Sequence, residues 1–154
     1  MGKKQEFEIC IRAVILKSGK ILVCKPKKKD FYYFPGGHLD FGESIKSALC
    51  REIKEELGIK VQKFSFIGAV DNVFTEDKIK HHEINLVFEV KVDRITEKSR
   101  EEYIEFALMD MRRFRKEKIL PIALKKALLN WLKNKRIFWA TQIYNKSIFY
   151  HGNK

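Results

Sequence analysis

Three carboxylates and an arginine lie in one short stretch of the chain, where two residues separate the pair Arg51-Glu52 from the pair Glu55-Glu56. In a helix each residue advances by about 100°, so the three glutamates share an arc of about 100°. Such crowding of like charges is costly unless a cation is bound nearby. Carboxylates without His or Cys favour a hard divalent cation, Mg²⁺ or Mn²⁺. The pattern therefore predicts a metal-binding helix face.

The residues around this cluster have the signals of a helix that packs on a sheet. Ser44 stands just before the run and can act as its N-cap. Gly58 falls where the helix should end. The arc beside the carboxylates is predicted to face the core, and it consists of Leu49, Cys50, Ile53 and Leu57.

The segment from Gly37 to Ile59 resembles the signature box of the Nudix (MutT-like) hydrolases, Gly-x5-Glu-x7-Arg-Glu-apolar-x-Glu-Glu-x-Gly-apolar. It matches every specified position, with Glu43 as the first glutamate. Such a match arises by chance with a probability on the order of one in ten million, given average residue usage. The resemblance implies an α/β fold, an α/β/α sandwich whose mixed β-sheet is flanked by helices.

The resemblance also implies a Mg²⁺- or Mn²⁺-dependent hydrolase that cleaves the phosphoanhydride bond of a nucleoside diphosphate linked to another group. A metal-activated water would be the nucleophile. The metal ligands implied are the Gly37 carbonyl and the carboxylates of Glu52, Glu55 and Glu56. The catalytic set implied is Glu52 and Glu55, with Arg51 orienting a glutamate through a charge-assisted pair.

Residues outside the box supply further candidates. Many relatives add a later glutamate as a metal ligand or base, and Glu101 and Glu102 are the first candidates here, followed by Glu105 and Glu83. Candidate substrate-binding residues are His38, Tyr33 and Lys27, and His81 and His82 are further candidates for phosphate contact. For all of these, the alternative is an ordinary structural or solvated role.

The order of predicted elements suits a mixed sheet with helices on its faces. Strands are expected at Glu6 to Leu16, Ile21 to Lys25, Phe31 to Phe34, Val61 to Val73, Glu83 to Val92 and Tyr103 to Met109. Thr75 to His81 is expected to be a polar connection. Helices are expected at Asp110 to Lys118 and Leu124 to Lys133, and Arg136 to Tyr150 is ambiguous between a strand pair and other structure. The 154 residues suggest one domain, with a basic, aromatic C-terminal extension from about residue 135.

Positive charge is concentrated at the C-terminal end. Residues 1–110 carry 20 Lys/Arg and 19 Asp/Glu, whereas residues 111–154 carry 12 and 1, which together give the net charge of +12. A field of this sign attracts polyanions. RNA is therefore a candidate partner beside a nucleotide substrate, and a dimer interface is the alternative use of the C-terminal aromatic residues.

The expected setting is the cytoplasm. No apolar run approaches the roughly 20 residues of a membrane span, and the first residues contain no apolar segment typical of a secretory signal. Cys10, Cys24 and Cys50 form no zinc motif and are interpreted as reduced core residues.

The substrate stays open between several classes. Thr75 stands where ADP-ribose-cleaving relatives tend to carry a proline, and residues 74–77 lack the tyrosine typical of relatives that cleave dinucleoside polyphosphates. Oxidised nucleoside triphosphates, sugar nucleotides and 5′-capped or triphosphate RNA are the other candidates. The alternatives to a small-nucleotide hydrolase are an RNA 5′-end pyrophosphohydrolase and a non-catalytic nucleotide- or RNA-binding Nudix module.

Overall fold

The computed structural model describes residues 4–143 and 146–151, with side chains described as far as Ile143. Of the aromatic residues in the C-terminal extension, Tyr144 lies outside the described residues, and the side chains of Phe149 and Tyr150 lie outside the described part. No helix within the described ranges is long and apolar enough to cross a membrane.

Three helices and nine strands make up the described chain. In order they are β1 (Gln5–Val14), β2 (Leu16–Lys17), β3 (Lys20–Pro26), β4 (Gly36–His38), α1 (Ile45–Leu57), β5 (Val61–Glu76), β6 (Ile79–Val92), β7 (Ile104–Asp110), α2 (Met111–Lys116), α3 (Ile122–Asn134), β8 (Phe138–Ile143) and β9 (Lys146–His151).

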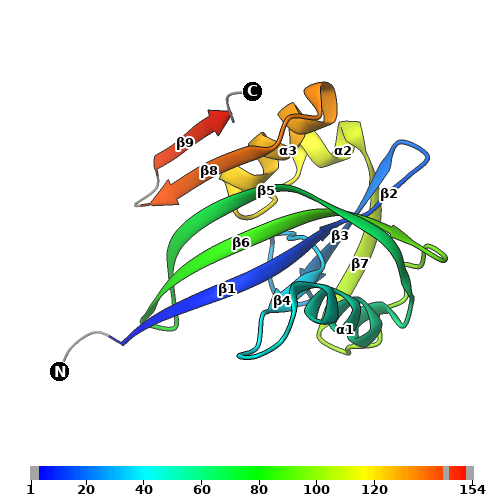
Figure 1. Cartoon of the computed structure of the whole chain (residues 1–154), viewed down its shortest axis with the longest axis horizontal. Helices are drawn as coiled ribbons and strands as arrows, with labels where there is room; N and C mark the ends of the chain where they lie inside the picture. Colours follow the sequence, from blue (N-terminus) through cyan, green and yellow to red (C-terminus); the bar gives the residue numbers. More distant parts are fainter. Residues whose placement is uncertain (1–3, 144–145, 152–154) are drawn as a thin grey trace.

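The strands form two sheets (Figure 1). The larger sheet has the order β4-β1-β6-β5-β8-β9 and the smaller has the order β2-β3-β7. Strand β1 runs parallel to β6, and β5 runs parallel to β8. The other pairs are antiparallel. The predicted mixed sheet is therefore confirmed.

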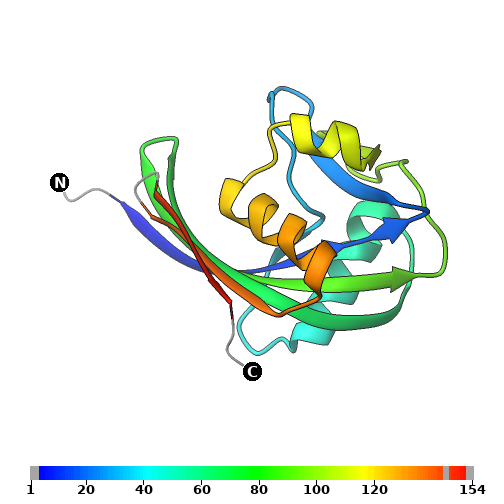
Figure 2. The same cartoon turned by 90° about the horizontal axis from the view of Figure 1, so that it is seen from above.

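Helices α1 and α3 lie on opposite faces of the larger sheet, and side chains of β1 alternate between the hydrophobic clusters on these two faces. Ile11 and Ala13 pack with Leu49 and Ile53 of α1. Val14 packs in the other cluster, which contains the buried residues of α3. Figure 2 shows α3 lying along the concave side of the curved larger sheet. The α/β/α arrangement is thus confirmed.

Helix α1 begins and ends where the sequence predicts. The Ser44 hydroxyl accepts a hydrogen bond from the Ser47 backbone N–H at 3.1 Å. At the other end Gly58 is in the left-handed conformation, and its N–H donates to the Lys54 carbonyl. The buried face differs from the prediction, because Cys50 is only partly buried whereas Ala48 and Glu56 are buried.

Two other expectations are wrong. Thr75 to His81 is not a polar connection, since β5 and β6 continue into a hairpin whose turn is Asp77 and Lys78, both with positive φ. Cross-strand contacts, such as the stacked rings of Phe74 and His81, stabilise the pairing of these two strands. Phe31 to Phe34 is not a strand, because Tyr32 and Tyr33 form only isolated bridges, to Ile119 and Cys24.

The ambiguous C-terminal segment is resolved as a strand pair. Strand β8 pairs in parallel with β5 and antiparallel with β9. The hairpin thereby extends the larger sheet beyond β5 and helps to cover α3, whose Trp131 is buried.

Candidate active site

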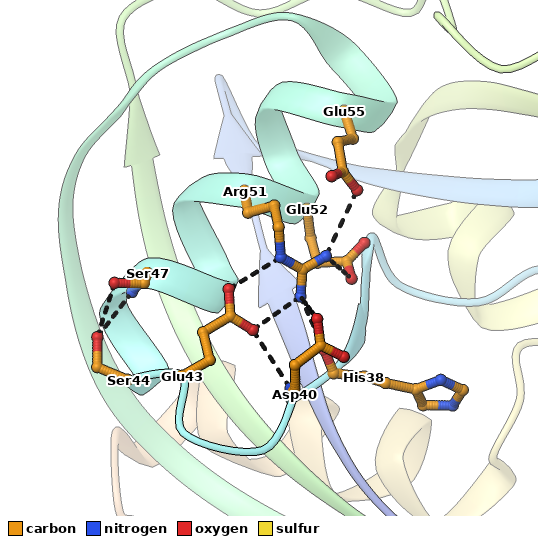
Figure 3. A network of polar contacts seen from close by, with 8 residues as sticks. All are labelled: His38, Asp40, Glu43, Ser44, Ser47, Arg51, Glu52 and Glu55. Atoms are coloured by element: carbon orange, nitrogen blue, oxygen red, sulfur yellow. Dashed lines mark hydrogen bonds and ion pairs between the residues drawn. The ribbon is translucent and has the colours of Figure 1, made fainter.

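Arg51 of α1 connects the loop before the helix to the helix's own carboxylates (Figure 3). Its Nε and Nη2 donate to the two oxygens of Glu43, each at 2.9 Å. Its Nη1 donates to Glu52 Oε1 at 2.8 Å and to Glu55 Oε2 at 3.4 Å. Nη2 also donates to the backbone carbonyl of His38 at 3.1 Å. One guanidinium group therefore fixes three carboxylates and the end of β4 relative to one another.

The glycine pair of β4 lies directly against the carboxylates of α1. Gly37 has no Cβ, and a Cβ there would overlap the carboxylate of Glu52. Gly36 has φ of 136°, and its N–H donates to Glu56 Oε2 at 3.1 Å. The close approach of β4 to the helix thus depends on glycine at position 37, whereas a Cβ at Gly36 would overlap the backbone of Ile11 in β1.

Glu56 is a buried carboxylic acid, and only 4% of the residue is exposed. Burial, opposed by the hydrogen bond from Gly36 and assisted by the negative charge of Glu52, raises the pKa of Glu56 to about 8. Without a bound cation the group therefore favours its neutral form at neutral pH.

The donor set fits a hard divalent cation. The oxygens gathered here come from the carboxylates of Glu52, Glu55 and Glu56 and from the backbone around Gly37, which packs on Glu52. The side chain of Glu55 is 52% exposed, so the cluster is open to solvent on that side. An all-oxygen set of this kind suits Mg²⁺ or Mn²⁺.

Of the later glutamates, Glu101 reaches this cluster. Its charge helps to raise the pKa of Glu56, and its side chain is hydrogen-bonded to Tyr103, whose pKa rises to about 12 chiefly through that bond. Glu102 and Glu105 are exposed; together with Lys27 and Glu101 they line a cavity of about 510 Å³. Glu83 is buried on the face of β6 beside Asn85 and lines a different cavity, of about 650 Å³.

The candidate substrate-binding residues lie at different parts of this surface. Lys27 is exposed, and its backbone N–H donates to the Tyr103 carbonyl. Tyr33 is half-buried and also lines the 650 Å³ cavity. His38 is exposed, and its Nε2 lies 3.3 Å from Glu8 Oε1. His81 is partly buried, and its Nδ1 lies 3.3 Å from Glu8 Oε2.

The 650 Å³ cavity is lined by aromatic and amide side chains, including Phe74, Asn72 and Gln142. Arg12 also lines it and donates from Nε to Asn85 Oδ1 at 3.0 Å. Its charge acts on Glu56, so this cavity adjoins the carboxylate site.

Arg12 and Tyr103 were not identified as candidate site residues from the sequence. An arginine inside the otherwise apolar run Ile9 to Ile15 is the signal that could have identified Arg12.

Parts of the chain are similar in sequence to curated proteins. The chain is 33% identical over 70 residues to an 8-oxo-dGTP diphosphatase of Buchnera aphidicola, covering 43% of this chain and 54% of that protein. It is 32% identical over 83 residues to an ADP-ribose pyrophosphatase of Methanocaldococcus jannaschii, with 52% and 48% covered. It is 38% identical over 64 residues to an RNA pyrophosphohydrolase of Campylobacter jejuni, with 38% and 41% covered. The matches thus span about half the length of these relatives, or less.

Solved structures share the fold over most of the chain. A MutT protein from Bacillus halodurans superposes with a TM-score of 0.68 at 16% identity, covering 92% of this chain and 97% of that one. A MutT Nudix hydrolase from Burkholderia pseudomallei superposes with a TM-score of 0.56 at 27% identity, covering 68% and 81%. The family model described as NUDIX domain matches residues 7–132. This chain therefore belongs to the NUDIX domain family.

Proposed function

We propose that the chain is a divalent-metal-dependent pyrophosphohydrolase that cleaves a phosphoanhydride bond of a nucleoside diphosphate derivative. The observation that carries the proposal is the cluster of carboxylates that Arg51 holds against the glycine pair of β4. Relatives named as diphosphatases and pyrophosphohydrolases support the reaction class.

The Gly37 carbonyl and the carboxylates of Glu52, Glu55 and Glu56 would hold the metal, with Glu101 as an additional ligand. When bound, Mg²⁺ or Mn²⁺ would neutralise phosphate charge and make a coordinated water more acidic. Glu56 would lose its proton on binding, because a nearby positive charge offsets the cost of burying its carboxylate.

The chain's own residues divide the remaining work. Arg51 is a positioning residue, since its contacts are with protein groups. Glu52 is held by the short contact from Arg51 and is 14% exposed. Glu55 has only the longer contact and is half exposed, so it is the carboxylate freer to accept a proton from an attacking water.

A nucleoside triphosphate suits the adjoining cavity best. Its volume of about 650 Å³ lies within the usual range for small-molecule sites. Tyr33 and Phe74 offer rings for stacking, and Asn72 and Gln142 offer amide groups for hydrogen bonds to a base. The proposed phosphate contacts are Lys27, which lines the 510 Å³ cavity with Glu101, and His38, which follows Gly37 in β4.

The test is a hydrolysis panel with Mg²⁺ or Mn²⁺ over canonical and oxidised nucleoside triphosphates, sugar nucleotides, dinucleoside polyphosphates and 5′-triphosphate RNA. Glu55→Gln should lower kcat by at least about a hundredfold, in line with loss of a general base. Glu89→Gln is the matched control, because Glu89 pairs with Lys91 away from this site. Full activity in Glu55→Gln would contradict the role of Glu55 as the base. A wild-type protein that hydrolyses no member of the panel would favour the non-catalytic binding module.

The charge distribution favours a second candidate, an RNA 5′-end pyrophosphohydrolase. The excess of 11 positive charges in residues 111–154 could hold the RNA backbone while the same carboxylates act on its 5′ phosphates. Preference for 5′-triphosphate RNA over every mononucleotide in the panel would support this candidate.

We expect the protein to act in the cytoplasm. The three cysteines are free thiols, and free thiols are usual in a reducing compartment.

A further inference from the structure

A second group of metal-ligating side chains lies on the larger sheet, apart from the carboxylates of α1. Ligand atoms of Cys10, His38 and Glu83 all lie within 4.8 Å of one another. A fourth side chain, Glu8, places Oε1 3.3 Å from His38 Nε2. The group thus offers one sulfur, one imidazole nitrogen and two carboxylates.

Strand pairing holds these four residues side by side. Cys10 of β1 is opposite His38 of β4, and Glu8 of β1 is opposite Glu83 of β6. Alternate residues of a strand share a face, so Glu8 and Cys10 point to the same side of the sheet. The ligands therefore come from three adjacent strands rather than from a flexible loop, and little backbone movement is needed to bring them onto one ion.

We propose that Cys10, His38, Glu83 and Glu8 form a Zn²⁺ site. A mixed set of thiolate, imidazole and carboxylate suits tetrahedral zinc. Cys10 is fully buried and Glu83 is 8% exposed, whereas His38 is exposed, so the ion would enter from the side of His38. The Cys10 thiol would give its proton to solvent on binding.

The charges of the site match a divalent cation. The ionised forms of Cys10, Glu8 and Glu83 carry three negative charges, and Arg12, whose charge acts on both Cys10 and Glu83, supplies one positive charge. The net charge of the ionised group is therefore −2, which the +2 charge of one zinc ion would neutralise. Without an ion, Glu83 has a hydrogen bond from Asn85 Nδ2 at 3.3 Å and one from Cys10.

A neighbouring triad must be separated from this site. The ligand atoms of Glu6, Glu8 and His81 also lie within 4.8 Å of one another, and Glu8 contacts both histidines. That triad has no sulfur, and neither does the carboxylate set of α1. Sulfur ligation is therefore the signature that distinguishes the proposed site from both.

The test uses the full-length, reduced protein and Co²⁺ as a spectroscopic substitute for Zn²⁺, with excess Mg²⁺ present to occupy the α1 carboxylates. Wild-type protein should show the near-ultraviolet thiolate-to-cobalt absorption, and one equivalent of Zn²⁺ should remove it. Cys10→Ser should lose the absorption. Cys50→Ser, which changes the partly exposed cysteine of α1, is the matched control and should keep it.

A second variant keeps the test decisive if Cys10→Ser does not fold. His38 is exposed, so His38→Ala should fold and bind Zn²⁺ at least about tenfold more weakly, because one ligand is lost. Zn²⁺ should also raise the melting temperature of wild-type protein, since it binds only the folded state. The proposal is overturned if wild-type protein gives no absorption, or if His38→Ala binds as tightly as wild type. None of these readouts depends on pyrophosphohydrolase activity.

Discussion

Arg51 determines the local geometry of the carboxylate site more than any one glutamate does. Its five donors match two planar carboxylates and a backbone carbonyl at once, which the single ammonium group of a lysine cannot do. The side chain is 30% exposed, so each contact stabilises the fold only modestly. Its main effect is therefore on the placement of Glu52 and Glu55.

Arg51→Lys should lower kcat by roughly a hundredfold, since small displacements of catalytic groups have effects of that size. KM should change little, because the donors of Arg51 are directed at protein groups. Steady-state kinetics measure both. Arg94→Lys is the matched control: Arg94 Nη2 also donates to a backbone carbonyl, that of Gly58 at 3.1 Å, but outside the site. Wild-type kcat in Arg51→Lys would contradict the positioning role.

Glu56 makes the stability of the metal-free protein depend on pH. Its pKa is about 8 in the folded state against 4.5 as the ordinary value, so the folded state binds more protons between these limits. The free energy of unfolding should therefore fall as pH rises through about 8. Below the ordinary value this contribution is fully present.

Urea unfolding in the presence of a chelator, at about pH 5 and about pH 9, measures this dependence. Glu56→Gln mimics the neutral acid and can still accept from Gly36, so its stability should change less between the two conditions. Glu89→Gln should keep the wild-type dependence. Equal pH dependence in wild type and Glu56→Gln would show that Glu56 is not the responsible group.

At the scale of elements, the site is a contact between β4 and the C-terminal half of α1. Strand β4 is only three residues long, and it pairs with β1 through Gly36, Gly37 and His38. The strand holds one side of the site and the helix the other. The absence of a side chain at Gly37 allows this close contact between strand and helix.

Gly37→Ala should therefore reduce activity more than stability. The added methyl group would push the Glu52 carboxylate out of place, with an expected loss of at least about tenfold in kcat. Gly19→Ala is the matched control, because Gly19 has nothing within 4 Å of its Cβ position. Its φ of 74° makes alanine cost roughly 1 kcal/mol of stability, but its activity should be that of wild type. Kinetics and thermal unfolding of both variants decide the question.

At the scale of the whole molecule, the charge is divided along the chain. The part that contains the carboxylate site is nearly neutral, and the last 44 residues carry an excess of 11 positive charges. Lys133 lies in the last turn of α3, and Arg136 lies just beyond it, before strand β8. Both residues are exposed. A polyanion longer than a mononucleotide could contact both regions.

Binding of 5′-triphosphate RNA should weaken steeply with salt, by more than about tenfold between roughly 50 and 200 mM. Neutralising Lys133 and Arg136 to Gln should reduce the slope of log K against log salt by about 2. Lys17→Gln with Lys20→Gln, at exposed positions of the near-neutral part, is the control. A slope that neither pair changes would argue against RNA contact at the end of α3.

The local features were predictable because they depend on residues close in the chain. The spacing of Glu52, Glu55 and Glu56 places them on adjacent faces of a helix whatever that helix contacts. Ser44 and Gly58 act on backbone groups three or four residues away. Hydrophobic periodicity likewise indicated most strands, but it could not show that Thr75 to His81 continues two of them, since polar strand residues there are stabilised by cross-strand partners.

By itself, the sequence determined the carboxylate-bearing helix, the signature from Gly37 to Ile59 that contains it and the mixed sheet that supports it. Only the tertiary structure decided that Glu56 is buried against Gly36, that Glu101 rather than Glu102 approaches it, and that Cys10, His38 and Glu83 meet on one sheet face. The physical reason is that burial and electrostatic environment depend on which distant segments pack together. Helix and turn signals act within a few residues, whereas these contacts join strands that are far apart in the chain.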